Sequence, residues 1–150
     1  MRVIIQRVSE ARVEIGSRIS GEIGKGLLIL LGIESDDAAE DVEWLCTKIP
    51  AMRIFQDEED KMNKCLHEVG GRILLVSQFT LHASTKKGNR PSFIRAARPE
   101  QAIPLYELFI KKLEEATGTE VMCGEFGAMM QVHLVNDGPV TIWMDSKSRE

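Results

Sequence analysis

The stretch GLLILLGI, residues 26–33, is an unbroken apolar run flanked by glycines. A strand with one face in water alternates apolar and polar side chains, whereas a continuous apolar run indicates a strand covered on both faces. The run is far too short to cross a bilayer, which takes about 20 residues. We therefore expect residues 26–33 to form a buried strand around which the rest of the domain is built.

Strand patterns surround this run on both sides. Residues 1–15 alternate well enough to form one or two strands. The glycines at positions 16, 21 and 24 are spaced as turns between short strands. Further strands are predicted, in chain order, over residues 53–56, 72–81, 129–135 and 140–144, with the turn NDGP (136–139) joining the last two.

Two other segments have helical periodicity. Residues 35–52 place apolar side chains at helical spacing, and Ser35 is the expected N-cap, followed by two aspartates that suit the positive end of the helix dipole. Residues 100–116 repeat the pattern, with Pro99 in the first turn and Gly118 as a natural stop. The sequence therefore predicts an α+β fold, a single β-rich domain over residues 1–150 with two helices.

The composition of the 150 residues is that of an ordinary globular protein, with 43% hydrophobic and 28% charged residues. The three cysteines form no CxxC pair, so we expect neither a disulfide framework nor a zinc site. Arg2, Gln6 and Arg7 interrupt the first apolar residues, and no signal peptide is expected. These features predict a cytoplasmic protein without a membrane segment, metal or cofactor.

Charge is distributed unevenly along the chain. The formal net charge is −4, yet residues 69–99 contain no Asp or Glu. The cations of this segment are Arg72, Lys86, Lys87, Arg90, Arg95 and Arg98. A local positive face on an acidic body can attract an anionic ligand, and a solvated loop that only maintains solubility is the alternative.

The stretch LLVSQFTLHAS, residues 74–84, changes abruptly from apolar to polar. Ser77, Gln78 and Thr80 follow three apolar residues, and a buried polar group without a partner costs about 1–3 kcal/mol. These side chains therefore need either partners or a function. On a strand, Thr80 and His82 would share one face, but at roughly 6–7 Å they are too far apart for direct proton transfer.

Familiar catalytic motifs are absent from the chain. It contains no GxGxxG after a strand, no P-loop, no HExxH and no GxSxG, and its three histidines are dispersed. If the protein is an enzyme, catalysis must come from backbone N–H groups that stabilise an oxyanion, or from the substrate itself.

Two motifs, SQFTL (77–81) and GPVT (138–141), together resemble the family of D-aminoacyl-tRNA deacylases. The likeness extends over the opening MRVIIQRV, residues 24–33, KGNRPSF (87–93) and residues 130–143. This resemblance implies a β-barrel-like α+β domain that forms a homodimer. It also implies that the chain hydrolyses the ester joining a D-amino acid to the terminal adenosine of a tRNA, and that it accepts glycyl-tRNA mischarged on tRNA(Ala).

The resemblance also implies the pocket residues. The SQFTL motif would line the catalytic pocket with Ser77, Gln78, Phe79 and Thr80. Two further positions would lie near the α-amino group and the adenine of the substrate, namely Phe126 and Met130. The family commonly has an aromatic residue at position 82, where this chain has His82.

Stereochemical selection is implied to depend on the second motif. Gly138 and Pro139 would be joined by a cis bond and reach into the pocket of the partner subunit, where they exclude the side chains of L-amino acids. Arg7 matches the position that holds this loop. Recognition of the D side chain itself is not implied, because every D side chain must be accepted.

The catalytic mechanism and the class of protein leave alternatives open. The 2′-OH of the terminal ribose can assist attack on the ester, and Thr80 could instead be the nucleophile, although no base is evident. From their charge, Lys86, Lys87 and Arg90 are expected to contact tRNA phosphates. The alternative from another class is a tRNA-binding module without catalysis.

Overall fold

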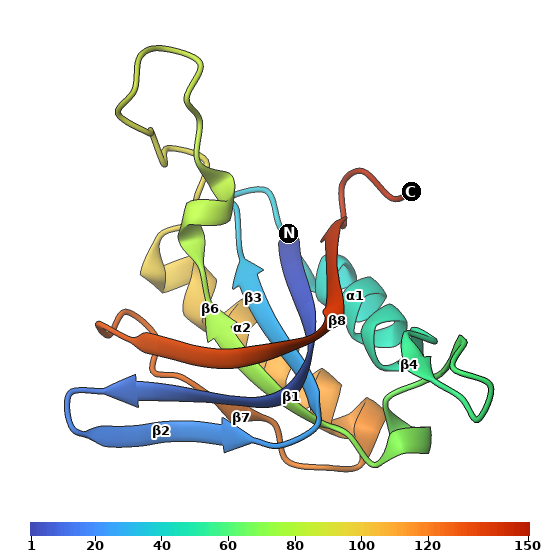
Figure 1. Cartoon of the computed structure of the whole chain (residues 1–150). Helices are drawn as coiled ribbons and strands as arrows, with labels where there is room; N and C mark the ends of the chain where they lie inside the picture. Colours follow the sequence, from blue (N-terminus) through green and yellow to red (C-terminus); the bar gives the residue numbers. More distant parts are fainter.

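Strand β3 (Gly26–Gly32) lies inside a six-stranded sheet in the computed structural model, which describes residues 1–150. The sheet runs in the order β2-β1-β3-β6-β7, and β8 pairs with β1 (Figure 1). The bounds of these strands are β1 Arg2–Ile15, β2 Arg18–Ile23, β6 Arg72–Ser77, β7 Met122–Cys123 and β8 Gln131–Asp145. A two-stranded sheet is formed by β4 (Phe55–Gln56) and β5 (Met62–Lys64).

Two helices, α1 (Ala39–Ala51) and α2 (Pro99–Thr117), pack together behind the sheet (Figure 1). The sheet is nearly closed and barrel-like, which confirms the predicted α+β fold with two helices. Single-turn 3₁₀ helices span His67–Val69 and Phe79–His82. Neither α-helix has the length and apolarity that a membrane crossing requires.

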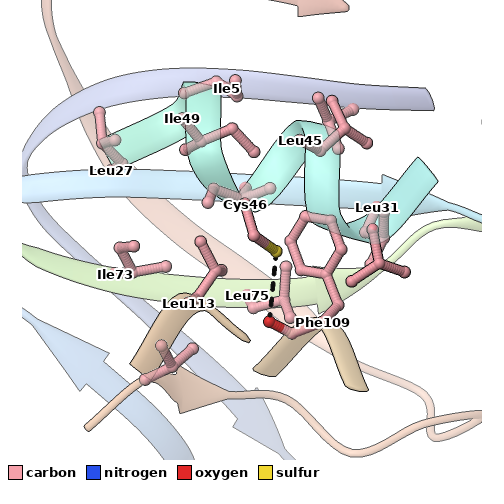
Figure 2. Close-up of a cluster of buried hydrophobic side chains, with 14 of the residues drawn as sticks. Ile5, Leu27, Leu31, Leu45, Cys46, Ile49, Ile73, Leu75, Phe109 and Leu113 are labelled. Atoms are coloured by element: carbon pink, nitrogen blue, oxygen red, sulfur yellow. Dashed lines mark hydrogen bonds between the residues drawn. The ribbon is translucent and has the colours of Figure 1, made fainter. Parts of the chain in front are cut away.

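The prediction that residues 26–33 are covered on both faces is confirmed. Leu27, Ile29 and Leu31 belong to the large core between the sheet and the helices. Leu28, between them in sequence, belongs to a second core inside the curved sheet. Figure 2 shows the larger core, where the thiol of Cys46 on α1 donates to the carbonyl oxygen of Phe109 on α2 over 3.5 Å.

Strand β1 produces the curvature of the sheet. Its first half pairs with β3 and its second half with β2, while its other edge pairs with β8 along most of its length. The barrel approaches closure where β2 meets β7, since the hydroxyl of Ser20 donates to the carbonyl of Cys123 over 3.2 Å. Glycine is needed there, because a Cβ on Gly21 would lie 2.9 Å from that same oxygen.

The first helix is shorter than predicted, because it begins at Ala39 and Ser35 is not its N-cap. The carboxylate of Asp37 accepts from the backbone N–H of Glu34 and pairs with the Met1 ammonium, which holds the preceding residues in a turn. Asp41 instead caps the helix, accepting from the Ala38 N–H at 2.9 Å. The second helix begins at Pro99 and ends before Gly118, as predicted.

The strand predictions also differ from the structure at three places. The strand expected over residues 72–81 ends at Ser77, and a 3₁₀ turn follows. The two strands expected at 129–135 and 140–144 are a single strand, because NDGP bulges out of β8 instead of reversing the chain. The short strand at 53–56 is reduced to Phe55–Gln56.

Asp41 is expected to stabilise the fold above acidic pH. Burial raises the pKa of its carboxyl, but hydrogen bonds from Lys147, Ser146 and the Ala38 backbone outweigh burial and bring the pKa to about 2, from an ordinary 3.8. A carboxyl with a lowered pKa stabilises the folded state above 3.8 and loses this effect as the pH falls toward 2. Asp41→Asn should therefore lower the free energy of unfolding at pH 7 by about 1–2 kcal/mol.

Urea unfolding between pH 7 and pH 2.5 measures this effect. The difference between wild type and Asp41→Asn should shrink as the pH falls below about 4. Asp36→Asn is the matched control, since Asp36 is exposed and its carboxylate forms no ion pair. A difference that stays constant with pH would assign the effect to packing rather than to the charge.

Candidate functional site

A cavity of about 360 Å³ opens where β6 ends. Ser77, Gln78 and Phe79 line it from one side, and Phe126 and Met130 line it from the segment that leads into β8. Leu31, Ile33 and Val76 add apolar surface to the lining. The structure thus brings together five of the residues that the sequence analysis assigned to one pocket.

The chain turns sharply at this cavity. The N–H of Gln78 donates to the Leu31 carbonyl at 2.7 Å, so the chain still pairs with β3 one residue beyond β6. The 3₁₀ turn then begins at Phe79, and the N–H groups of Leu81 and Ala83 donate to carbonyls of this turn. The first N–H groups of a helical turn have no acceptor within it, which leaves those of Phe79 and Thr80 to point elsewhere.

Thr80 is exposed and does not line the cavity directly. The side-chain amide of Gln78 donates to its hydroxyl oxygen at 2.5 Å, so the hydroxyl proton is left free to be donated to a ligand. No hydrogen bond connects Thr80 with His82, whose imidazole is buried. The sequence analysis placed Thr80 and His82 on one face of a strand. They lie on a 3₁₀ turn instead, so that shared strand face is absent.

His82 faces Glu34 rather than the cavity. Its Nδ1 lies 3.8 Å from a carboxylate oxygen of Glu34, and neither ring nitrogen has a hydrogen-bonding side chain. Burial lowers the pKa of the imidazole below its ordinary 6.5. Glu34 also accepts from the Arg95 guanidinium at 2.7 Å. The sequence analysis did not single out Glu34, although it is the first charged residue after the buried run 26–33.

Arg7 is a buried cation that contacts the GPVT segment. Its Nε donates to the carbonyl of Asp137 at 2.9 Å, and its Nη1 donates to the carbonyl of Ile54 at 2.6 Å. The segment bulges from β8 between two strand pairs, Gln6 with Thr141 and Val8 with Asn136. The guanidinium therefore links the bulge to the rest of the barrel.

The Gly138–Pro139 peptide bond is cis, as the sequence analysis expected. Both residues are exposed, and neither lines the cavity of its own chain. The side-chain amide of Asn136 donates to the carbonyls of Arg7 and Val140, at 3.0 and 2.9 Å. This asparagine, which the sequence analysis did not single out, holds the two ends of the bulge together.

The cations of residues 69–99 do not form one face. Arg72 lies at the start of β6, where its side chain approaches Glu120, and Arg95 is paired with Glu34. Lys86, Lys87 and Arg90 are exposed on a loop that projects from the body, drawn in olive and yellow in Figure 1. No group of three or more His, Cys, Asp or Glu is placed to hold a metal ion.

A model of the family D-Tyr-tRNA(Tyr) deacylase matches residues 4–145. The chain belongs to this family. It is therefore a hydrolase of the deacylase class, which confirms the family resemblance drawn from SQFTL and GPVT. The match to the family model covers nearly the whole chain, so the cavity and the bulge both lie within the matched region.

Curated relatives agree with the deacylase family over full length. A D-aminoacyl-tRNA deacylase of Akkermansia muciniphila is 65% identical over 150 residues, covering 100% of both chains. The same name is given to a relative in Bacteroides thetaiotaomicron that is 59% identical, again over 100% of both chains.

Solved structures support the deacylase fold. The chain is similar to the c-Myc DNA Unwinding Element Binding Protein, with a TM-score of 0.91 and 40% identity over 97% of this chain and 98% of that one. A probable eukaryotic D-amino acid tRNA deacylase has a TM-score of 0.80 at 18% identity, over 95% and 97% of the two chains. The latter likeness concerns the fold alone.

His82 should make this deacylase less stable in mild acid. A histidine with a lowered folded pKa stays neutral while the unfolded chain takes up a proton, so stability falls as the pH drops below 6.5. His82→Leu should remove this component, and urea unfolding between pH 5 and 8 would measure it. His67→Gln is the control for replacing a histidine, because His67 is exposed. A wild-type profile that His82→Leu does not flatten would contradict the prediction.

Proposed function

We propose that this chain hydrolyses the ester of D-aminoacyl-tRNA and releases the free D-amino acid and the tRNA. Glycyl-tRNA mischarged on tRNA(Ala) is a second substrate. The observation that carries the proposal is the cavity in which Ser77, Gln78 and Phe79 meet Phe126 and Met130, in a chain of the deacylase family. Its volume of about 360 Å³ lies within the range of small-molecule sites, about 300–1,000 Å³.

The turn at residues 79–82 supplies the catalytic electrostatics. The backbone N–H groups of Phe79 and Thr80 begin this turn, and they stabilise the oxyanion that forms when the ester carbonyl is attacked. An aminoacyl ester is already activated, so the vicinal 2′-OH of the terminal ribose assists attack without a strong protein base. The absence of a contact between Thr80 and His82 favours this substrate-assisted mechanism over a threonine nucleophile.

The GPVT segment selects between D- and L-amino acids. Gly138 and Pro139 lie exposed on a bulge and outside their own cavity, so they complete the site of a partner subunit in a homodimer. The carbonyls of the bulge receive the substrate ammonium, and its backbone occupies the space that an L side chain needs. Arg7 and Asn136 fix the bulge for this role through their hydrogen bonds.

The outer edge of β8 supports the homodimer. Strand β8 pairs only with β1, and it carries three exposed apolar side chains, Val132, Val135 and Trp143. Unpaired edges with exposed apolar residues mark interaction surfaces in soluble proteins. A second copy that covers this edge would also bring its own Gly138–Pro139 bulge near the subunit boundary.

The loop that carries Lys86, Lys87 and Arg90 contributes contacts to tRNA phosphates. The three cations are exposed and form no ion pair, so they are available to an anionic ligand. Hydrolysis distinguishes the enzyme from the alternative, a tRNA-binding module without catalysis. Membership in a family of deacylases favours the enzyme.

Hydrolysis should be selective for the D ester and the glycyl ester. On one tRNA, the D-aminoacyl ester should be cleaved at least about 100-fold faster than the L ester, because the bulge rejects the L side chain before reaction. Counting the remaining ester over time for D, L and glycyl substrates measures this ratio. Equal rates on D and L esters would exclude the proposed selection.

Arg7→Lys weakens the support of the bulge, so this variant should hydrolyse the L ester faster than wild type does.

The hydroxyl of Thr80 should matter less than the 2′-OH of the substrate. Thr80→Ala should retain activity within about tenfold, whereas replacing the terminal 2′-OH by hydrogen should cost about 100-fold or more. Single-turnover hydrolysis of the two substrates by wild type, Thr80→Ala and Thr80→Ser measures both effects. A dead Thr80→Ala with an active Thr80→Ser, together with rapid cleavage of the deoxy substrate, would identify Thr80 as the nucleophile.

A further inference from the structure

Phe93, at the end of the KGNRPSF stretch, is an aromatic residue for which the proposed reaction has no use. Its ring packs edge to face against Phe79, with centroids 5.1 Å apart and planes at 76°. Phe79 lines the cavity and is 57% exposed, so the aromatic pair lies at the cavity mouth. The next residue, Ile94, is 91% exposed. The Phe79–Phe93 pair therefore forms an aromatic patch beside the cavity, and exposed Ile94 follows it in the chain.

The backbone fixes this patch from both sides. Ser84 and Ser92 exchange two backbone hydrogen bonds, of 2.8 and 2.9 Å, which close the projecting loop immediately before Phe93. On the other side, the carbonyl of Arg95 accepts from the N–H of Ser35 at 3.1 Å. Phe93 and Ile94 are thus held on a short segment between two anchored points.

The loop closed by the two serines carries the free cations Lys86, Lys87 and Arg90. They lie on the projecting loop (Figure 1), whose closing serine directly precedes Phe93, and no Asp or Glu occurs between residues 69 and 99. Aromatic surface bordered by cations is the arrangement with which proteins bind single-stranded nucleic acid.

We propose that Phe93, with Phe79, forms a stacking subsite for the base that precedes the terminal adenosine of the tRNA. The proposal rests on the proposed function, which puts the ester of that adenosine in the adjoining cavity. The 3′ end of a tRNA is single-stranded, so its penultimate base can leave its neighbours and stack on the patch while the loop contacts phosphates. This subsite reads a feature common to all tRNAs, which suits an enzyme that accepts many of them.

Two ester substrates test the subsite. One is a D-amino acid esterified to adenosine, and the other is the same amino acid on the trinucleotide CCA. Phe93→Leu keeps apolar packing against Phe79 but removes the ring, and Phe93→Tyr is the matched control that keeps the ring. Phe93→Leu should lower kcat/KM about tenfold on the trinucleotide ester and leave the adenosine ester unchanged within about twofold. Phe93→Tyr should behave as wild type on both substrates.

A trinucleotide ester with an abasic middle position tests whether Phe93 and the middle base act through the same contact. On this substrate Phe93→Leu and wild type should be equal, because the stacking partner is already missing. Equal losses from Phe93→Leu on the adenosine and trinucleotide esters would overturn the proposal, since Phe93 would then act only by shaping the wall at Phe79. No loss on either ester would overturn it as well.

Binding without reaction separates this inference from the proposed function. If wild type hydrolyses none of the esters, the proposed function fails, but the Kd values of uncharged CCA and of adenosine monophosphate still decide the subsite. CCA should bind more tightly than the mononucleotide. Phe93→Leu should reduce this ratio of the two Kd values about tenfold. Replacing Lys86, Lys87 and Arg90 by Gln should instead reduce the salt dependence of CCA binding, which Phe93→Leu should leave unchanged. Equal affinities of Phe93→Leu and wild type for CCA would refute the stacking contact.

Discussion

The parallel pairing of β3 with β6 is the constraint on which the rest of the structure depends. Both strands are covered on two faces, so a one-residue shift in their register would move side chains from one core into the other and disrupt the packing of both. Their closest approach requires glycine, since a Cβ on Gly26 would lie 1.9 Å from the Arg72 carbonyl. Because Leu31 pairs with Ser77 and accepts from the Gln78 N–H, the chain leaves the core at one defined point. The cavity forms at that point.

This exit explains why polar residues follow an apolar strand. Ser77 and Gln78 are half-buried where the strand ends, and the Gln78 amide satisfies the hydroxyl oxygen of Thr80 at 2.5 Å. Gln78 and Thr80 therefore satisfy each other within the turn, and the backbone N–H groups that begin the turn have no acceptor within it. A continued strand would have used those N–H groups in the ladder, which would have left none for a ligand.

The buried cation at Arg7 connects the other half of the site to the barrel. A guanidinium removed from water must have its N–H groups satisfied, and the carbonyls of Ile54 and Asp137 do so at 2.6 and 2.9 Å. The same bonds tie the GPVT bulge to strand β1. Each subunit thus carries a cavity and a bulge that are separate in the single chain, and the proposed homodimer unites the two across an interface.

The sequence by itself determined the two-sided burial of residues 26–33, the second helix between Pro99 and Gly118, the α+β class and the family. These features depend on periodicity, capping residues and motifs, and each of these signals lies in residues that are close together in the sequence. The tertiary structure alone decided that α1 begins at Ala39, since distant partners, the Met1 ammonium and Lys147, bind Asp37 and Asp41. It also decided that residues 131–145 form one strand, because pairing with β1 on both sides of the bulge overrides the turn that NDGP predicts. Local propensity cannot anticipate such partners, since their contribution depends on chain segments that meet only after folding.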